Sequence, residues 1–230
     1  MSDLARDIYR QNRFIEFLSR LFDILILNFL TLALCVPVIT AADATASMYY
    51  VLLKIVRDED NGVVKPYFRF FGDNFLKSLP YALILVPVNA LLYFFLIGMA
   101  YGGWGNPVLF GLLLSVLAIV IVLSVWTLLL FAQFDNTVGK TFENALNLAS
   151  HNPARSAIIL IANGLMGVLA VFSPSIFIYM LAIWLFMGAG IIGFISVRQA
   201  EPVFRELMPE KEVIPDPLEE GYDDDEESGE

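Results

Sequence analysis

Four polar side chains interrupt the apolar stretches of this sequence, and their types could support chemistry in apolar surroundings. Asn28, Asn89 and Asn163 each stand among aliphatic and aromatic residues, and Asp23 stands in the first such stretch. Amides in such places hydrogen-bond across a helix interface or line a polar cavity, while a carboxylate pairs with a base such as Arg20 or faces that cavity. The sequence leaves both interpretations open: structural hydrogen bonds, or a polar axis through these four residues.

The rest of the sequence contains no motif that is typical of an enzyme active site. The segment VGKT at 138–141 is similar to the end of a phosphate loop, but Phe134 stands where that motif needs glycine, and no strand is predicted before it. His151 is the only histidine and Cys35 the only cysteine, and neither has a second ligand at metal spacing. We therefore expect no catalytic, metal or cofactor-binding residues, and predict that the chain is not an enzyme.

The elements that must hold the four polar residues are membrane helices. The composition is 58% hydrophobic against 17% charged, which does not fit the balance of a soluble domain. A helix needs ~20 apolar residues to cross a ~30 Å hydrocarbon core, and five stretches reach or approach that length: 21–36, 79–101, 107–131, 156–172 and 174–195. The sequence thus predicts an all-α, polytopic membrane helix bundle.

The distribution of positive charge favours a sixth span at residues 41–56. With five spans the basic residues divide between both sides of the membrane, whereas with six all 14 Lys and Arg lie on one side. Short loops rich in Lys and Arg stay in the cytoplasm, so both termini are expected there. The alternative for this short segment is a re-entrant or surface helix.

A local signal marks the start of the sixth helix. Pro37 ends the preceding helix, and Thr40 followed three residues later by Asp43 has the pattern of a capping box. In that motif the threonine side chain accepts from a free amide of the first turn. Pro37, Thr40 and Asp43 together predict a helix that begins at Ala41.

The six spans form three hairpins with a weak internal repeat. A polar and aromatic segment with the character of a short interfacial helix precedes each hairpin on the cytoplasmic side. The basic residues Arg20, Lys77 and Arg155 precede Asn28, Asn89 and Asn163, respectively. Two of the segments, 65–78 and 141–156, are expected to face a partner.

The net charge of −10 comes from the end of the chain. Residues 201–230 hold 13 acidic and two basic residues, so residues 1–200 are close to neutral. We predict an integral membrane helical domain over 1–200 and an acidic, disordered cytoplasmic tail over 201–230. The basic residues elsewhere interleave with acids, so no nucleic-acid partner is expected.

Residues 28–59, NFLTLALCVPVITAADATASMYYVLLKIVRDE, carry a resemblance to a known family. An asparagine-led apolar helix, Pro-Val-x-Thr, a small-residue helix with an aromatic, and a basic residue before an acidic turn resemble the YesL-like bacterial membrane proteins, called domain of unknown function 624. The matching residues are Asn28, Pro37, Val38, Thr40, Tyr49 and Arg57. Ala42 and Asp43 depart from the pattern, since the family has small residues or glycine there.

The resemblance implies a bacterial plasma membrane protein without established activity. Members of the family are often encoded beside carbohydrate ABC importers, so the expected function is an accessory, assembly or regulatory partner of a carbohydrate transport system. The expected partners are the lipid bilayer and ABC importer subunits or another membrane protein. The alternative is a small transporter or channel whose polar axis is lined by Asn28, Asn89 and Asn163.

Overall fold

The computed structural model describes residues 3–59, 62–102 and 106–208, and within these ranges all regular secondary structure is helical, without strands. The fold is therefore an all-α bundle, as predicted. Eight α-helices, one 3₁₀ turn (η1) and one π-helical segment (η2) follow in the order α1 (Asp3–Cys35), η1 (Val38–Thr40), α2 (Ala41–Val56), α3 (Val64–Tyr101), α4 (Pro107–Gln133), α5 (Val138–His151), α6 (Pro153–Phe172), α7 (Pro174–Ile183), η2 (Trp184–Gly188) and α8 (Ala189–Leu207).

Six helical segments in the described part of the chain are long and apolar enough to cross a membrane. Five lie in α1, α3, α4, α6 and the continuous run α7–η2–α8, and the sixth is Val38–Val56, which contains α2. The chain is thus a multi-pass membrane protein. The predicted helix start at Ala41 is confirmed.

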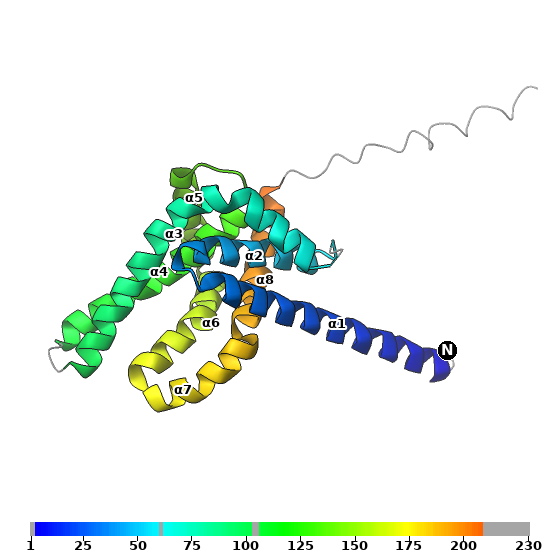
Figure 1. Ribbon diagram of the computed structural model, residues 1–230, viewed down its shortest axis with the longest axis horizontal. Coiled ribbons are helices and arrows are strands. Elements are labelled where there is room, and N and C mark those ends of the chain that lie inside the picture. Colours follow the sequence, from blue (N-terminus) through cyan, green and yellow to red (C-terminus); the bar gives the residue numbers. More distant parts are fainter. Residues whose placement is uncertain (1–2, 60–61, 103–105, 209–230) are drawn as a thin grey trace, which may run out of the picture.

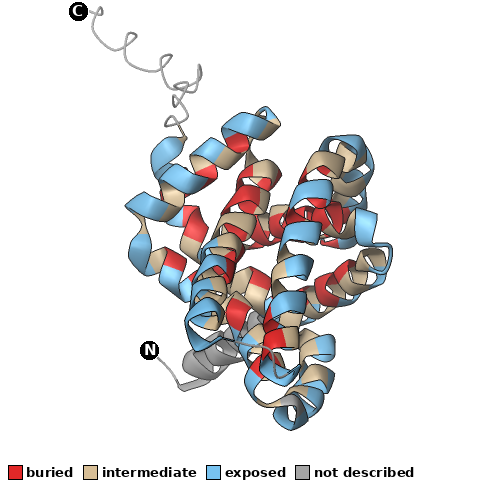
Figure 2. Cartoon of the chain, turned by 90° about the vertical axis from the view of Figure 1, so that its left-hand side faces the viewer, coloured by how far each residue is buried: buried red, intermediate tan, exposed pale blue. Residues whose placement is uncertain are grey.

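Helix α2 lies at the centre of the bundle. It packs against α1, α3, α4 and α8, and 11 of its residues are buried. The largest cluster of buried apolar side chains surrounds it, with Leu52 of α2, Trp126 of α4 and Phe204 of α8 fully buried. Figure 2 shows buried residues along the inner sides of the packed helices and exposed residues around the outside, the arrangement expected of helices whose outer faces meet lipid.

The hairpins α3–α4 and α6–α7 project away from this centre (Figure 1). Helix α3 crosses the top of the view and then turns down to the lower left, and it contains Pro80 and Pro87. Each proline lacks the amide hydrogen that would bond the preceding turn, which allows a long helix to bend. The segments that carry acidic and basic residues lie at the opposite end of the molecule. They are the α2–α3 connection, helix α5 and the last turns of α8, and we call this end the charged end.

The three predicted interfacial helices are not all separate helices in the structure. In the first two hairpins the amphipathic segment continues directly into the span, so α1 has 33 residues and α3 has 38. In the third it is the separate helix α5, because the backbone leaves helical geometry at Asn152, before Pro153. A proline disfavours helical geometry in the residue before it, which fits the break at Asn152, whereas α3 continues as a helix through Pro80.

The packed helical part extends beyond the predicted boundary at residue 200. Helix α8 continues to Leu207, and Glu201, Val203 and Phe204 are buried. Residues 209–230, which include most of the predicted acidic tail, lie outside the described residues.

Candidate functional site

The turn between α1 and α2 lies beside the middle of α3 rather than level with its end, and its residues Val36 and Val38 are exposed. Ala41 and Thr45 border the same cavity as Leu85 and Asn89 of α3. From Asn89, α3 continues to Tyr101, which corresponds to about 18 Å of further helix. Figure 1 accordingly shows the α3–α4 hairpin reaching well past this turn. The start of α2 therefore lies near the middle of the depth that α3 and α4 span.

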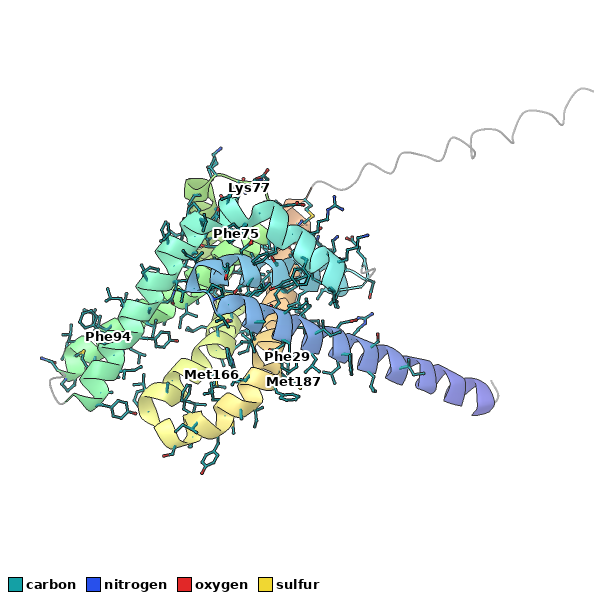
Figure 3. The ribbon with its side chains drawn as sticks, in the orientation of Figure 1. Phe29, Phe75, Lys77, Phe94, Met166 and Met187 are labelled. Atoms are coloured by element: carbon teal, nitrogen blue, oxygen red, sulfur yellow. The ribbon has the colours of Figure 1, made fainter. Side chains whose placement is uncertain are left out.

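Two cavities flank the start of α2. One has a volume of about 350 Å³ and is bordered by Ala42, Asn89 and Ser124. The other has a volume of about 380 Å³ and is bordered by Asn163 and by Met166, which Figure 3 labels on α6. Thr45 borders both cavities. The α1–α2 hairpin thus separates two spaces large enough for water or a small solute.

Asp43 is fully buried in the first turn of α2. Neither of its carboxylate oxygens has a hydrogen-bond partner. The Ser47 hydroxyl, one turn further along α2, and the Thr127 hydroxyl of α4 are also buried without a partner. A buried carboxylate without compensation is costly in free energy, so Asp43 is the most unusual polar group among the described residues.

The capping-box prediction for Thr40 and Asp43 is wrong. The Thr40 hydroxyl makes no bond to the first turn of α2. It donates instead toward the Leu34 carbonyl and toward the Pro37 carbonyl, the latter at 2.6 Å. The physical reason is the 3₁₀ turn Val38–Thr40, which gives Thr40 helical backbone angles, whereas a capping residue needs extended ones. Thr40 therefore satisfies carbonyls left free where α1 ends.

Asn28 of α1 holds the π-helical segment η2. Its side-chain nitrogen donates to the carbonyls of Leu185 at 2.9 Å and Phe186 at 3.1 Å, while its Oδ1 accepts from the Gly190 amide at 3.0 Å. The change from α to π geometry alters backbone pairing, so this segment needs partners from outside the helix. The Phe29 and Phe186 rings pack edge to face beside it, near Met187 in Figure 3.

Asn89 and Asn163 form a different and mutually similar arrangement. Asn89 donates to the Ser124 hydroxyl at 3.0 Å, and Asn163 donates to the Ser196 hydroxyl at 3.1 Å. In each case an asparagine on the first helix of a hairpin bonds a serine on the second helix, so the weak sequence repeat has a structural counterpart in these two hairpins. In the first hairpin Asn28 turns to η2 instead, and the Ser47 hydroxyl of α2 has no partner.

The four residues of the predicted polar axis therefore have separate surroundings. Asn89 borders one cavity and Asn163 the other, whereas Asn28 is fully buried against η2. Asp23 is half-buried on α1. The base next to it in sequence, Arg20, forms an ion pair at 2.6 Å with Asp58 after α2. Whether these residues act together in transport stays a prediction.

An ion-pair network joins α2 to α8 at the charged end. Arg57 donates to both carboxylate oxygens of Glu201, at 2.8 and 2.7 Å, and Arg205 donates to Glu201 at 2.8 Å. Glu201 is buried and Arg57 is nearly buried, so removal of either side chain would leave the other as a buried charge without a partner. Sequence reasoning placed Glu201 in the acidic tail, because its partner Arg57 is distant in sequence.

Two contacts connect α3 with α5 and with the loop before α5, near the two segments predicted to face a partner. Tyr81 of α3 donates to the Thr141 hydroxyl of α5 at 3.0 Å, and Lys77 pairs with Asp135 between α4 and α5 at 3.2 Å. Two leucines in these segments are exposed, Leu76 by 77% and Leu146 by 56%. Figure 3 shows Lys77 and Phe75 at the top of the molecule, on α3. We call this α3–α5 region the inner surface.

The fold and site together define a polytopic helical membrane protein with a buried acidic centre. The family model "protein of unknown function, DUF624" matches residues 24–96, from α1 through most of α3. The matched region includes Asn28, Asp43 and Asn89, but not Asn163. No curated protein and no solved structure matches the chain.

Proposed function

We propose that the chain is a bacterial DUF624 protein that serves as an accessory or assembly partner of a carbohydrate transport system. The family match over residues 24–96 supports the first part of this proposal. The inner surface supports the second, because it combines exposed leucines with charged side chains beside a membrane span. Exposed apolar side chains with polar residues around them mark sites of protein or membrane interaction.

The proposed orientation places the charged end and both termini in the cytoplasm. All Lys and Arg residues belong to segments that a six-span topology puts on one side, and the positive-inside rule assigns that side to the cytoplasm. The inner surface then faces the compartment in which an importer's ATPase subunits lie. ABC importer subunits are therefore the proposed partner.

Purification from native membranes in mild detergent tests this function. Stoichiometric recovery of an importer's membrane or ATPase subunits with the full chain is the expected result. Replacement of Leu76 and Leu146 by Ala should reduce that recovery at least severalfold. The matched control is Leu112→Ala, because Leu112 is 60% exposed but lies in the apolar span α4. Recovery of the chain alone from every preparation would contradict the proposal.

Removal of residues 209–230 in the same experiment locates the contact further. Loss of the importer subunits on truncation would assign the contact to the acidic end of the chain, and retention would assign it to the inner surface. Both kinds of variant are needed, because the truncation tests a contact made through charge and the leucine variants test a contact made through apolar side chains.

A small transporter or channel is the second candidate, because two cavities flank α2. Asn89 and Asn163 border those cavities and Asn28 does not. Flux of sugars or ions into liposomes that contain the purified protein tests it. If the protein transports, Asn89→Leu and Asn163→Leu should abolish flux. Absence of flux with every solute tried would count against this function.

A further inference from the structure

The buried oxygens near the start of α2 have no partner within the protein. In the described part of the chain, the buried side-chain polar atoms without a hydrogen bond are both Asp43 oxygens, Ser47 Oγ and Thr127 Oγ1. Asp43 and Ser47 are four residues apart and share one face of α2, and Thr127 lies on α4, which packs against α2. Buried oxygens without a partner, on one face of a helix and on a helix packed against it, indicate a group that binds them.

The basic residues of α2 cannot neutralise Asp43. Lys54 and Arg57 lie 11 and 14 residues further along the helix, about 16 and 21 Å away. Each is engaged locally, Lys54 over the Tyr50 ring at 4.6 Å and Arg57 with Glu201. Coulombic attraction across such distances is weak beside the cost of burying a carboxylate.

Among the described residues, the groups shown to face this region from neighbouring elements are neutral, and the bases of α3 nearest to Tyr67, Lys65 and Arg69, are exposed. From α3 the Tyr67 hydroxyl faces this region, bonded to the Ala44 carbonyl at 3.1 Å and to Thr31 at 3.3 Å, and from α1 Cys35 lies near. Helix α4 contains no titratable residue at all. The charged residues of α8 begin at Arg198, past the position where Gly193 meets Met48 and Leu52. Tyr67 and Cys35 are neutral groups at ordinary pH.

The cavities nearest to Asp43 in sequence are the two beside α2, although Asp43 itself lines neither. Ala42 and Thr45, on either side of Asp43 in sequence, border the cavity of about 350 Å³, and Thr45 also borders the larger one. The site lies near the start of a helix at mid-depth, a position in which membrane proteins bind small ions between helix ends and hydroxyl side chains.

We propose that Asp43, with Ser47 and Thr127, binds a monovalent cation, either H⁺ or Na⁺. One carboxylate and two neutral hydroxyls carry a net charge of −1, which a monovalent ion balances and a divalent ion would overcompensate. A proton converts the carboxylate into a neutral acid that can donate a hydrogen bond, and Na⁺ accepts both carboxylate and hydroxyl oxygens as ligands. Either ion removes the uncompensated charge. This inference does not depend on the proposed function.

Thermal unfolding of the full chain in detergent tests the site and separates the two ions. In the first arm NaCl replaces choline chloride at constant pH 8, and in the second the pH is lowered from 9 to 6 in choline chloride. A midpoint that rises with Na⁺ identifies Na⁺. A midpoint that rises only with acid, by roughly 3 °C per pH unit while Asp43 titrates, identifies H⁺.

The variant Asp43→Asn should abolish either response, because the amide is already neutral. Asp73→Asn is the matched control, since Asp73 is exposed and pairs only with exposed Arg69 on α3, and it should retain the wild-type response. If Asp43→Asn does not fold, the Ser47→Ala, Thr127→Val variant should require roughly fivefold more cation for the same rise. The proposal would be overturned if the wild-type unfolding midpoint did not change in either arm. It would also be overturned if Asp43→Asn, or the Ser47→Ala, Thr127→Val variant, responded as the wild type does.

Discussion

Asn28 shows how one amide can stabilise an irregular helical turn inside a membrane protein. It satisfies two carbonyls and one amide around η2. Gly188, at the end of η2, leaves room for the Trp184 side chain, since a Cβ there would lie 2.3 Å from Trp184 Cδ1. The turn is thus supported both by a polar contact from α1 and by close packing within its own helix.

Replacement of Asn28 by Leu should destabilise the protein more than the same change at Asn163. Asn28→Leu leaves several buried backbone groups without a partner, at a cost of about 1–3 kcal/mol. Asn163→Leu removes one bond between side chains of neighbouring helices, worth about 0.6 kcal/mol on average. Unfolding of both variants in a denaturing detergent measures the difference, and equal losses would contradict the structural role given to Asn28.

The sequence indicates which residues are unusual but not what each of them contacts. The buried asparagines stand out in apolar runs, yet nothing near Asn28 in the sequence shows that its partners lie in a π-helix more than 150 residues away. Thr40 and Asp43 match a capping box by spacing alone, and only the 3₁₀ turn between the helices prevents it. The contacts of Asn28 depend on residues distant in sequence, and those of Thr40 depend on local backbone geometry.

At the scale of elements, α1 and α8 approach closely through Gly190. A Cβ on Gly190 would lie 2.7 Å from the Ile24 carbonyl oxygen and 3.2 Å from Asn28 Cβ. The contact is with backbone, which cannot move without separating the helices. Gly193, one turn further on, faces the flexible end of Met48, with Met48 Cε at 2.6 Å from the added atom.

We expect Gly190→Ala to cost about 1–3 kcal/mol of stability and Gly193→Ala distinctly less. The methionine end can change its rotamer, whereas the Ile24 carbonyl belongs to the α1 backbone. Gly190→Ala should also weaken the bond between Asn28 and the Gly190 amide. Denaturation curves of the two variants compare them directly, and the opposite order would show that α1 and α8 pack less closely than described.

Most helix positions could be predicted from sequence, because apolar length and prolines define them. The three hairpins follow from these signals, whereas the prediction of a helix start at Ala41 also used a capping box that the structure does not contain. The continuity of the amphipathic segments with α1 and α3 could not, since no local signal separates an interfacial helix that stops from one that continues. The extension of α8 to Leu207 depends on Glu201 meeting Arg57, a contact between distant residues.

For the whole molecule, topology is the property to test first. A reporter inserted after Asn61, between α2 and α3, should be found in the cytoplasm together with the N-terminus. A six-span protein has both on one side, because α1 and α2 form a hairpin. A control insertion between α3 and α4, after Gly102, should be found on the opposite side. If the reporter after Asn61 is found outside the cytoplasm, α2 is not a returning span.

The mid-depth turn between α1 and α2 has a consequence for the bilayer around the protein. Toward the charged end the molecule presents all its spans, but beyond this turn only α3, α4, α6 and α7–η2–α8 continue. In a bilayer centred on α3 and α4, the leaflet at the charged end would therefore surround more helices than the opposite leaflet does. A wedge of this kind is accommodated with least strain where the membrane bends with the wider end on its convex side.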